Sequence, residues 1–142
     1  MLYVAEPRAG YTVKPPLVVD CSALAAVLFE EPMRDEALRR LAHRALHAPT
    51  LIEHEVASVA LKKFRQGWPA ASIELALGDF DKQAIELHRI EIPAQCELAQ
   101  RFGLSAYDAA YLRLAQRLRA PLATFDRALA EAAHRVLGEL GE

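Results

Sequence analysis

The chain is short of cysteine and of net charge. It has two cysteines in 142 residues, Cys21 and Cys96, and a formal net charge of -2. Two cysteines are too few for a disulfide-stapled secreted scaffold and lack the paired spacing of a zinc site. Near-neutral charge gives no cationic field of the kind that indicates a nucleic-acid partner by charge alone. We therefore expect reduced thiols and a cytoplasmic location.

Long apolar runs and several catalytic signatures are also missing. No segment reaches the roughly 18 to 20 apolar residues that span a bilayer, so we expect no membrane association. Residues 1–16 contain three prolines and lack the basic-then-apolar order of a secretory signal. They are predicted to form an N-terminal arm before a single domain, 17–142. A glycine-rich phosphate loop and a Gly-x-Ser-x-Gly elbow are absent too.

What the chain does have is a 53% hydrophobic composition and a regular alternation of strand-like and helix-like segments. The pattern predicts an α/β fold, a three-layer α/β/α sandwich with a mostly parallel central sheet. Strands are expected at 17–20, 45–48, within 85–92, at 121–125 and, as an edge strand, at 135–137. Helices are expected at 22–28, 35–43, 51–66, 70–80, 93–102 and 105–118, with a last one from residue 127.

Four acids stand at or near the junctions of these elements. Asp20 closes the first strand, and Asp126 follows the strand 121–125. Ligands of open α/β sheets bind beyond the carboxyl ends of the strands, so acids there can converge from distant parts of the chain. Each of the two also has the ordinary explanation of capping the helix that follows.

Asp108 and Glu55 lie within predicted helices. Leu104, Tyr111 and Leu112 surround Asp108 at helical spacing, which predicts that its carboxylate faces the core, although Ser105-x-x-Asp108 also fits a capping box. Periodicity does not favour Glu55 decisively over an ordinary surface glutamate. Four acids brought together would repel one another unless a cation joins them, so the set predicts a shared metal site.

The histidines indicate no better site. His43 and His47 are four residues apart without a Glu-x-x-His context, and we interpret them as a surface pair; His54 and His88 show nothing stronger. Basic residues that would be available to a nucleic-acid ligand are Lys62, Lys63, Arg65, Arg113 and Arg127.

Four stretches, in order, resemble the motifs of PIN-domain ribonucleases, and most closely the VapC-like toxins. They are LVVDCSALAAVLFEEP, HAPTLIEHEVASVALKK, LSAYDAAYLRLA and LATFDRALAEAA, which run from Leu17 to Ala133. The resemblance implies a parallel α/β/α sandwich, RNA as the substrate, products with a 5′-phosphate, a homodimer, and a cognate antitoxin that inserts a segment into the active-site groove.

Position by position, the resemblance assigns the catalytic and metal-binding acids to Asp20, Glu55, Asp108 and Asp126. Glu55 is preferred to Glu53 because it precedes Val56-Ala57-Ser58. Ser22 and Thr124 match supporting hydroxyl positions. An oxygen-rich site of this kind suits Mg²⁺, with Mn²⁺ as a substitute. We expect metal-assisted phosphodiester hydrolysis, in which Asp20 and Asp108 hold the ion most directly.

Two other functions remain open from the residues. Asp20 could be the nucleophile of a phosphotransfer enzyme, although Asp20-Cys21-Ser22 lacks a second aspartate two residues on. The chain could also be a non-catalytic module of the same fold that binds a partner protein. That alternative predicts normal folding without cleavage under any divalent metal.

Overall fold

A parallel β-sheet forms the middle layer of the protein. The computed structural model describes Met1, Tyr3 and residues 14–141. All strand pairings are parallel and the strand order is β3-β2-β1-β4. This confirms the predicted fold class. The strands are β1 (Pro16–Val19), β2 (Ala45–Pro49), β3 (Glu86–His88) and β4 (Leu122–Ala123).

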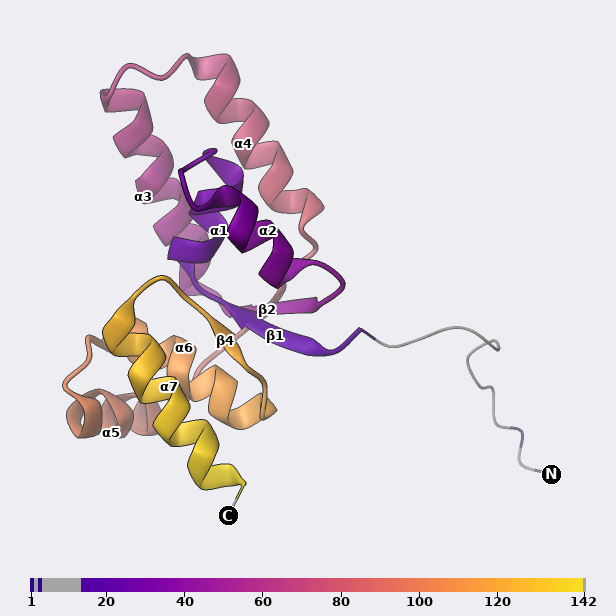
Figure 1. Ribbon diagram of the computed structural model, residues 1–142, viewed down its shortest axis with the longest axis vertical. Coiled ribbons are helices and arrows are strands. Elements are labelled where there is room, and N and C mark those ends of the chain that lie inside the picture. The colour runs from indigo at the N-terminus through magenta and orange to yellow at the C-terminus, as the bar shows by residue number, and fades with distance from the viewer. Residues whose placement is uncertain (2, 4–13, 142) are drawn as a thin grey trace.

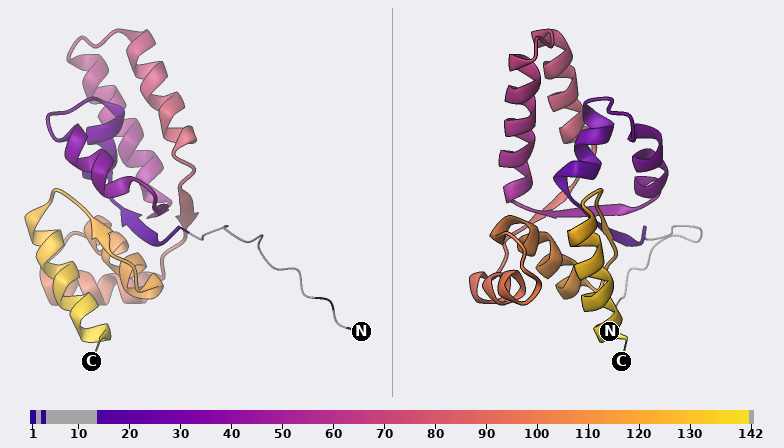
Figure 2. Two further views of the ribbon diagram at one scale, coloured as in Figure 1. Left: turned by 45° about the vertical axis from the view of Figure 1, so that its right-hand side comes forward. Right: turned by 60° about the vertical axis from the view of Figure 1, so that its left-hand side comes forward.

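Helices cover both faces of this sheet, as the side views show (Figure 1, Figure 2). One face carries the helices that connect β1 to β2 and β2 to β3, which are α1 (Cys21–Leu28), α2 (Arg34–Leu41), α3 (Leu51–Arg65) and α4 (Ala70–Lys82). The other face carries α5 (Ile92–Phe102), α6 (Ala106–Leu118) and α7 (Arg127–Leu140). Apart from the edge strand expected at 135–137, the predicted helices and strands therefore exist, with ends that differ by a few residues.

The core lies on both sides of β1. Leu17, Val18 and Val19 are all buried, which is typical of a central parallel strand covered on two faces. Helix α6 packs against β1 and β2, and its Leu112 is fully buried. Because α6 is held in the core, the residues of its first turn have a fixed position relative to the ends of the strands.

The sheet has a topological switch point between β1 and β4. The chain leaves β1 toward β2 over one face and returns to β4 from the helices of the other face (Figure 1). Such a point opens a crevice beyond the carboxyl ends of the two strands. Asp20 follows β1 and Asp126 lies three residues after β4, so both acids stand at this crevice.

Two sequence-based expectations need comment. The edge strand expected at 135–137 is wrong, because these residues lie inside α7. Val136 continues a buried stripe with Leu129, Ala132 and Ala133, whose spacing of three and four residues is helical. The predicted arm 1–16 lies mostly outside the described residues, and β1 begins at Pro16.

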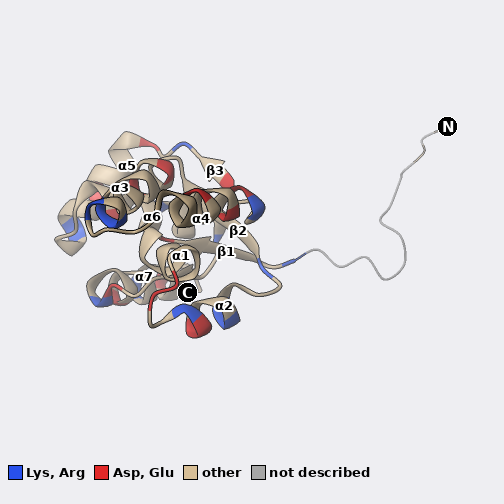
Figure 3. Cartoon of the chain, turned by 90° about the horizontal axis from the view of Figure 1, so that it is seen from above, with Lys and Arg blue, Asp and Glu red and all other residues tan. Residues whose placement is uncertain are grey.

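Charges of both signs are distributed over the surface. In Figure 3 basic and acidic residues are interspersed among the helices, and α2 carries both. The C-terminal turn of α3 is the exception, because Lys62, Lys63 and Arg65 gather there. Within the described residues no helix is long and apolar enough to cross a membrane.

Candidate active site

Asp20 is the buried centre of the candidate site. It is 6% exposed, the only buried polar or charged residue among the described ones. Its Oδ1 accepts hydrogen bonds from the hydroxyl of Ser22 at 2.7 Å and from the backbone N–H of Ala23 at 3.0 Å. The Thr124 hydroxyl donates to Oδ2. The carboxylate is thus held in one orientation by three donors, one of which comes from the far end of the chain.

Ser22 and Thr124 connect the first acid to the last one. Ser22 Oγ accepts a hydrogen bond from the backbone N–H of Phe125 at 2.9 Å, and Thr124 Oγ1 accepts one from the N–H of Asp126 at 2.9 Å. Each hydroxyl therefore donates to Asp20 and accepts from the loop between β4 and α7. This network fixes the position of Asp126 relative to Asp20.

Glu55 is distinguished from Glu53 by a contact that the sequence does not show. The Tyr111 hydroxyl of α6 donates to Glu55 Oε1 at 2.5 Å, across 56 positions of the chain. Tyr111 is itself buried, and Glu55 is half-buried, whereas Glu53 is exposed. The expectation of an ordinary surface glutamate therefore fits Glu53, and Glu55 points toward the helix that carries Asp108.

Asp108 and Asp126 occupy helix N-termini at the rim. Ser105 Oγ accepts from the Asp108 N–H at 3.0 Å, so the serine half of the expected capping box is present, and Asp108 is only half-buried. Asp126 is exposed and caps α7, accepting from the N–H of Leu129 at 2.9 Å. Asp20 likewise caps α1. Capping and participation in the site are therefore compatible for these aspartates.

The acids influence one another's ionisation. Burial raises the pKa of Asp20, and the charge of Asp126 adds to this, against the hydrogen bonds from Thr124, Ser22 and Ala23. Burial raises the pKa of Glu55, with further contributions from Asp20 and Asp108 and an opposing one from the Tyr111 hydroxyl. Burial and the charges of Asp126 and Asp20 raise the pKa of Asp108, opposed by Ser105. The structure therefore brings the four acids together around uncompensated negative charge.

This donor set fits a hard divalent cation. Mg²⁺ and Mn²⁺ prefer carboxylate oxygens, and Mg²⁺ keeps several waters and so needs few direct protein ligands. Among residues 14–141, Met1 and Tyr3, the three side chains whose ligand atoms all lie within 4.8 Å of one another are those of His47, Glu86 and His88. No three of the four acids form such a close group.

One hollow lies beside the site, and another lies away from the four acids. One, of about 440 Å³, is lined by Cys21, Ser22 and Phe125 among other residues and so lies directly beside Asp20. Burial and the charges of Glu55, Asp20 and Glu31 raise the pKa of the Cys21 thiol to about 12, which leaves it protonated and unreactive at neutral pH. The other hollow, of about 580 Å³, lies between α3 and α4 and contains none of the four acids.

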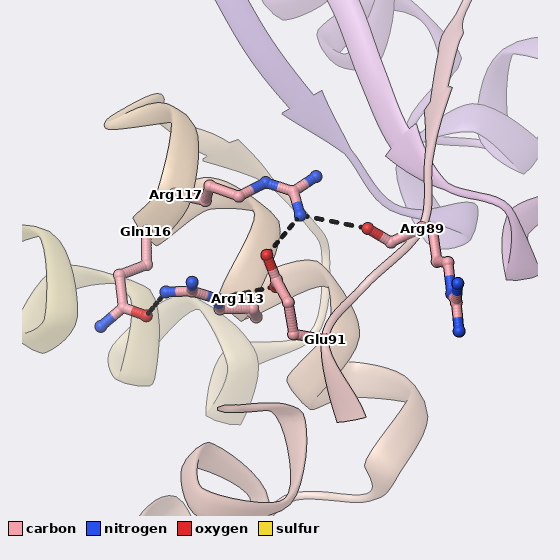
Figure 4. A network of polar contacts seen from close by, with 5 residues as sticks. All are labelled: Arg89, Glu91, Arg113, Gln116 and Arg117. Carbon is pink, nitrogen blue, oxygen red and sulfur yellow. Dashed lines mark hydrogen bonds and ion pairs between the residues drawn. The ribbon is translucent and has the colours of Figure 1, made fainter. Parts of the chain in front are cut away.

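An ion-pair network braces the helix that carries Asp108 (Figure 4). Glu91 accepts from Arg117 at 2.9 Å and from Arg113 at 3.1 Å, and Arg117 also donates to the carbonyl of Arg89 at 3.1 Å. The backbone N–H of Glu91, Arg117 and Arg113 together lower the pKa of Glu91 to about 2. The network ties α6 to the connection between β3 and α5. Sequence reasoning offered Arg113 as an RNA contact and missed this role.

The predicted pairing of His43 with His47 is wrong. His43 lies between α2 and β2 with a positive φ of 61°, whereas His47 lies in β2 and faces His88 of β3. His47 Nδ1 and His88 Nε2 are 2.8 Å apart, and they share one hydrogen bond. The helical spacing of four residues carried no meaning here because the chain between the two histidines is not helical.

The raised carboxyl pKa values predict how the metal-free protein responds to pH. An acid whose folded-state pKa exceeds its unfolded value of about 4 binds protons more tightly when folded. The associated destabilisation is absent below the unfolded pKa, grows as the pH rises from the unfolded to the folded pKa, and is complete above the folded pKa. In a metal chelator, the free energy of unfolding of wild type should therefore fall more steeply than that of Asp108→Asn as the pH rises from about 4 toward neutrality. Chemical denaturation measures both; equal slopes would contradict this account of the cluster.

Comparison with known proteins identifies the family of this chain. The family model of the PIN domain matches residues 17–135. The chain therefore belongs to the PIN domain family. Ribonuclease VapC3 of Pyrobaculum aerophilum is 35% identical to this chain over 122 residues. The match covers 81% of this chain and 92% of that protein.

Two further relatives have related names and one solved structure has a related fold. Ribonuclease VapC3 of Mycobacterium tuberculosis is 33% identical, covering 88% of this chain and 93% of its own. Ribonuclease VapC9 of the same species is 32% identical, covering 81% and 89%. The crystal structure of PAE2754 from Pyrobaculum aerophilum matches with a TM-score of 0.67 and 22% identity, covering 90% of each chain. At that identity the last match supports the fold.

Proposed function

We propose that this protein is a divalent-metal-dependent endoribonuclease of the VapC type, the toxin of a toxin-antitoxin pair. The observation that carries the proposal is the convergence of Asp20, Glu55, Asp108 and Asp126 at the switch point of a PIN-domain sheet. The names of the relatives support RNA as the substrate. Mg²⁺ is the proposed ion, and Mn²⁺ a substitute.

Each residue has a proposed role that follows from its surroundings. Asp20 and Asp108 hold the ion, because their charges interact with those of the other acids: both raise the pKa of Glu55, and Asp126 raises the pKa of both. When bound, the ion supplies a Lewis acid that polarises the phosphoryl oxygen and activates water for in-line attack. Glu55, fixed by Tyr111, and Asp126, at the exposed rim, would position a nucleophilic water in line with the leaving oxygen. Ser22 and Thr124 keep Asp20 from rotating.

The phosphotransfer alternative is less well supported. A nucleophilic aspartate must turn an oxygen toward phosphorus, but three hydrogen bonds hold the two oxygens of Asp20 in one orientation. The residue is also almost fully buried. Both facts favour a fixed ligand over a nucleophile that must change its geometry during the reaction.

Only some of the basic residues expected to contact RNA are free of other ion pairs among the described residues. Lys63 pairs with Glu31 and lies over the Trp68 ring, and Arg127 pairs with Glu131. Lys62 and Arg65, both exposed on the last turns of α3, make no ion pair with another described residue. We therefore place the phosphate-backbone contacts of RNA first on Lys62 and Arg65.

A cognate antitoxin and a homodimer are the proposed partners, by similarity to VapC proteins. Exposed apolar side chains support the existence of a protein partner: Leu61 is 56% and Phe64 59% exposed, and both line the hollow between α3 and α4. Contiguous exposed apolar surface of this kind marks interaction sites.

A cleavage assay tests the proposed function. Purified protein is incubated with single-stranded RNA or with DNA of the same sequence, in Mg²⁺, in Mn²⁺ or in chelator. We expect internal cleavage of RNA only, dependent on the metal, with products that a 5′-phosphate-dependent exonuclease degrades. Asp108→Asn should be inactive, and its induction in cells should permit growth that wild type arrests. A well-folded wild type that leaves every RNA intact in both metals would instead support the non-catalytic binding module.

A further inference from the structure

A second cluster of potential metal ligands lies on the strands β2 and β3, apart from the four acids. His47 Nδ1 is 2.8 Å from His88 Nε2 and 3.5 Å from Glu86 Oε2. The acids of the candidate active site follow β1 and β4 or belong to α3 and α6, so none of them contributes to this group. The two clusters also differ chemically, one being nitrogen-rich and the other made of oxygen ligands alone.

The strand register places these three side chains on one face of the sheet. His47 is paired with Glu86 in the parallel register, and His88 comes two residues after Glu86. Side chains two apart along a strand point to the same face. The ligand positions are therefore set by the backbone of two hydrogen-bonded strands, which makes the cluster rigid without help from a loop.

The distances suit a tetrahedral ion after a small adjustment. Zinc–ligand bonds of 2.0–2.1 Å in tetrahedral geometry require ligand atoms to lie about 3.3 Å apart. The His47–Glu86 separation of 3.5 Å is already near this value, and the two imidazole nitrogens, at 2.8 Å, need to separate by about 0.5 Å. Either His47 Nδ1 or His88 Nε2 accepts the hydrogen bond between them, so the lone pair of that nitrogen already points into the space between the two rings.

Access and local charge also permit an ion. The Glu86 side chain is 68% exposed while that of His47 is 14% exposed, so one side of the cluster is open to solvent for entry and for a water ligand. Arg117 is a nearby positive charge, since it donates to the carbonyl of Arg89, next to His88, but it is paired with Glu91 (Figure 4). The carboxylate of Glu91 offsets the repulsion that Arg117 exerts on a cation.

We propose that His47, Glu86 and His88 form a binding site for a borderline transition-metal ion, Zn²⁺ in the first instance, that clamps the edge strand β3 to β2. Imidazole with one carboxylate selects Zn²⁺, Ni²⁺ or Cu²⁺, whereas the acidic site prefers Mg²⁺ or Mn²⁺. The ion acts on stability: β3 has only three residues, and Glu91, which braces α6, comes three residues after its end.

Zinc titration of the chelator-stripped full chain, in excess Mg²⁺ to fill the acidic site, tests this proposal. Isothermal calorimetry should give one Zn²⁺ per chain in wild type, and the melting temperature should rise on binding. His47→Gln and His88→Gln should each weaken Zn²⁺ binding at least about tenfold, since loss of even an indirect ligand partner costs that much. His54→Gln, on the exposed face of α3, is the matched control and should bind as wild type does.

Further variants separate this site from the acidic one and from a folding defect. Asp20→Asn should leave Zn²⁺ binding unchanged. Glu86→Gln alters an exposed side chain, should preserve the circular dichroism spectrum, and should still weaken binding. With Co²⁺ in place of Zn²⁺, wild type should show the intense visible absorption bands of a four-coordinate ion. His88→Gln should lack these bands. Equal binding by wild type and both histidine variants, no binding by wild type, or loss of binding only in Asp20→Asn would each overturn the proposal.

Discussion

Replacing Asp20 with asparagine is expected to reduce metal-dependent RNA cleavage by a factor on the order of a thousand or more. An ion held by carboxylates contributes several kcal/mol to transition-state stabilisation, and about 4 kcal/mol corresponds to that factor. Asparagine keeps the shape of the side chain and one oxygen, which can still accept from Ser22 or Thr124. The measurement is kcat/KM on a fluorogenic RNA in Mg²⁺ and Mn²⁺.

The stability of this variant separates chemistry from folding. In metal-free buffer at neutral pH, Asp20→Asn removes one of the mutually repelling charges and should fold as wild type does by circular dichroism. Asp79→Asn, an exposed aspartate on α4, is the matched control and should cleave at the wild-type rate. If Asp20→Asn cleaves RNA as fast as this control, the proposed site is wrong.

Glu55→Gln and Glu53→Gln form a second test, with the two substitutions two residues apart on one helix. Glu55→Gln should lower cleavage about a hundredfold or more, because general acid–base or water-positioning groups contribute typically 10²–10⁴-fold. Glu53→Gln should have no effect on cleavage, since its side chain is exposed, whereas that of Glu55 is half-buried. Both should fold normally, and single-turnover rates measure the difference.

Tyr111→Phe tests whether the hydrogen bond to Glu55 matters for cleavage. Loss of the tyrosine hydroxyl removes the 2.5 Å hydrogen bond to Glu55 Oε1 and leaves every charge of the site in place. Cleavage should fall less than in Glu55→Gln, because the glutamate remains but is no longer held. If Glu53→Gln lowered the cleavage rate as much as Glu55→Gln does, the preference for Glu55 that the Val56-Ala57-Ser58 motif suggested would be contradicted.

The placement of Asp20 and Asp126 was predictable because strand ends are visible in the sequence. Both residues follow apolar runs, and in parallel sheets those runs end at one edge. The capping explanation that competed with this prediction proved compatible with it, since Asp20 and Asp126 each cap a helix. A local backbone role and a long-range site role use different lone pairs of one carboxylate.

Glu55 and the histidine pair show what sequence periodicity misses. The contact with Tyr111 spans 56 positions and the one between His47 and His88 spans 41, and both depend on how separate elements pack. Family resemblance supplied Glu55, but no pattern in the chain indicated His88. The edge strand expected at 135–137 is wrong because three adjacent residues show no periodicity by themselves. Over a longer window, Val136 continues the helical spacing of the buried residues Leu129 and Ala133.

The bond between Thr124 and Asp20 joins residues 104 positions apart, and it sets an order of events during synthesis. During translation Asp20 is added to the chain early and Thr124 near the end. Until β4 has emerged and paired with β1, Asp20 has neither Thr124 nor Asp126 beside it. A nascent chain therefore carries an incomplete acidic cluster until translation is almost finished.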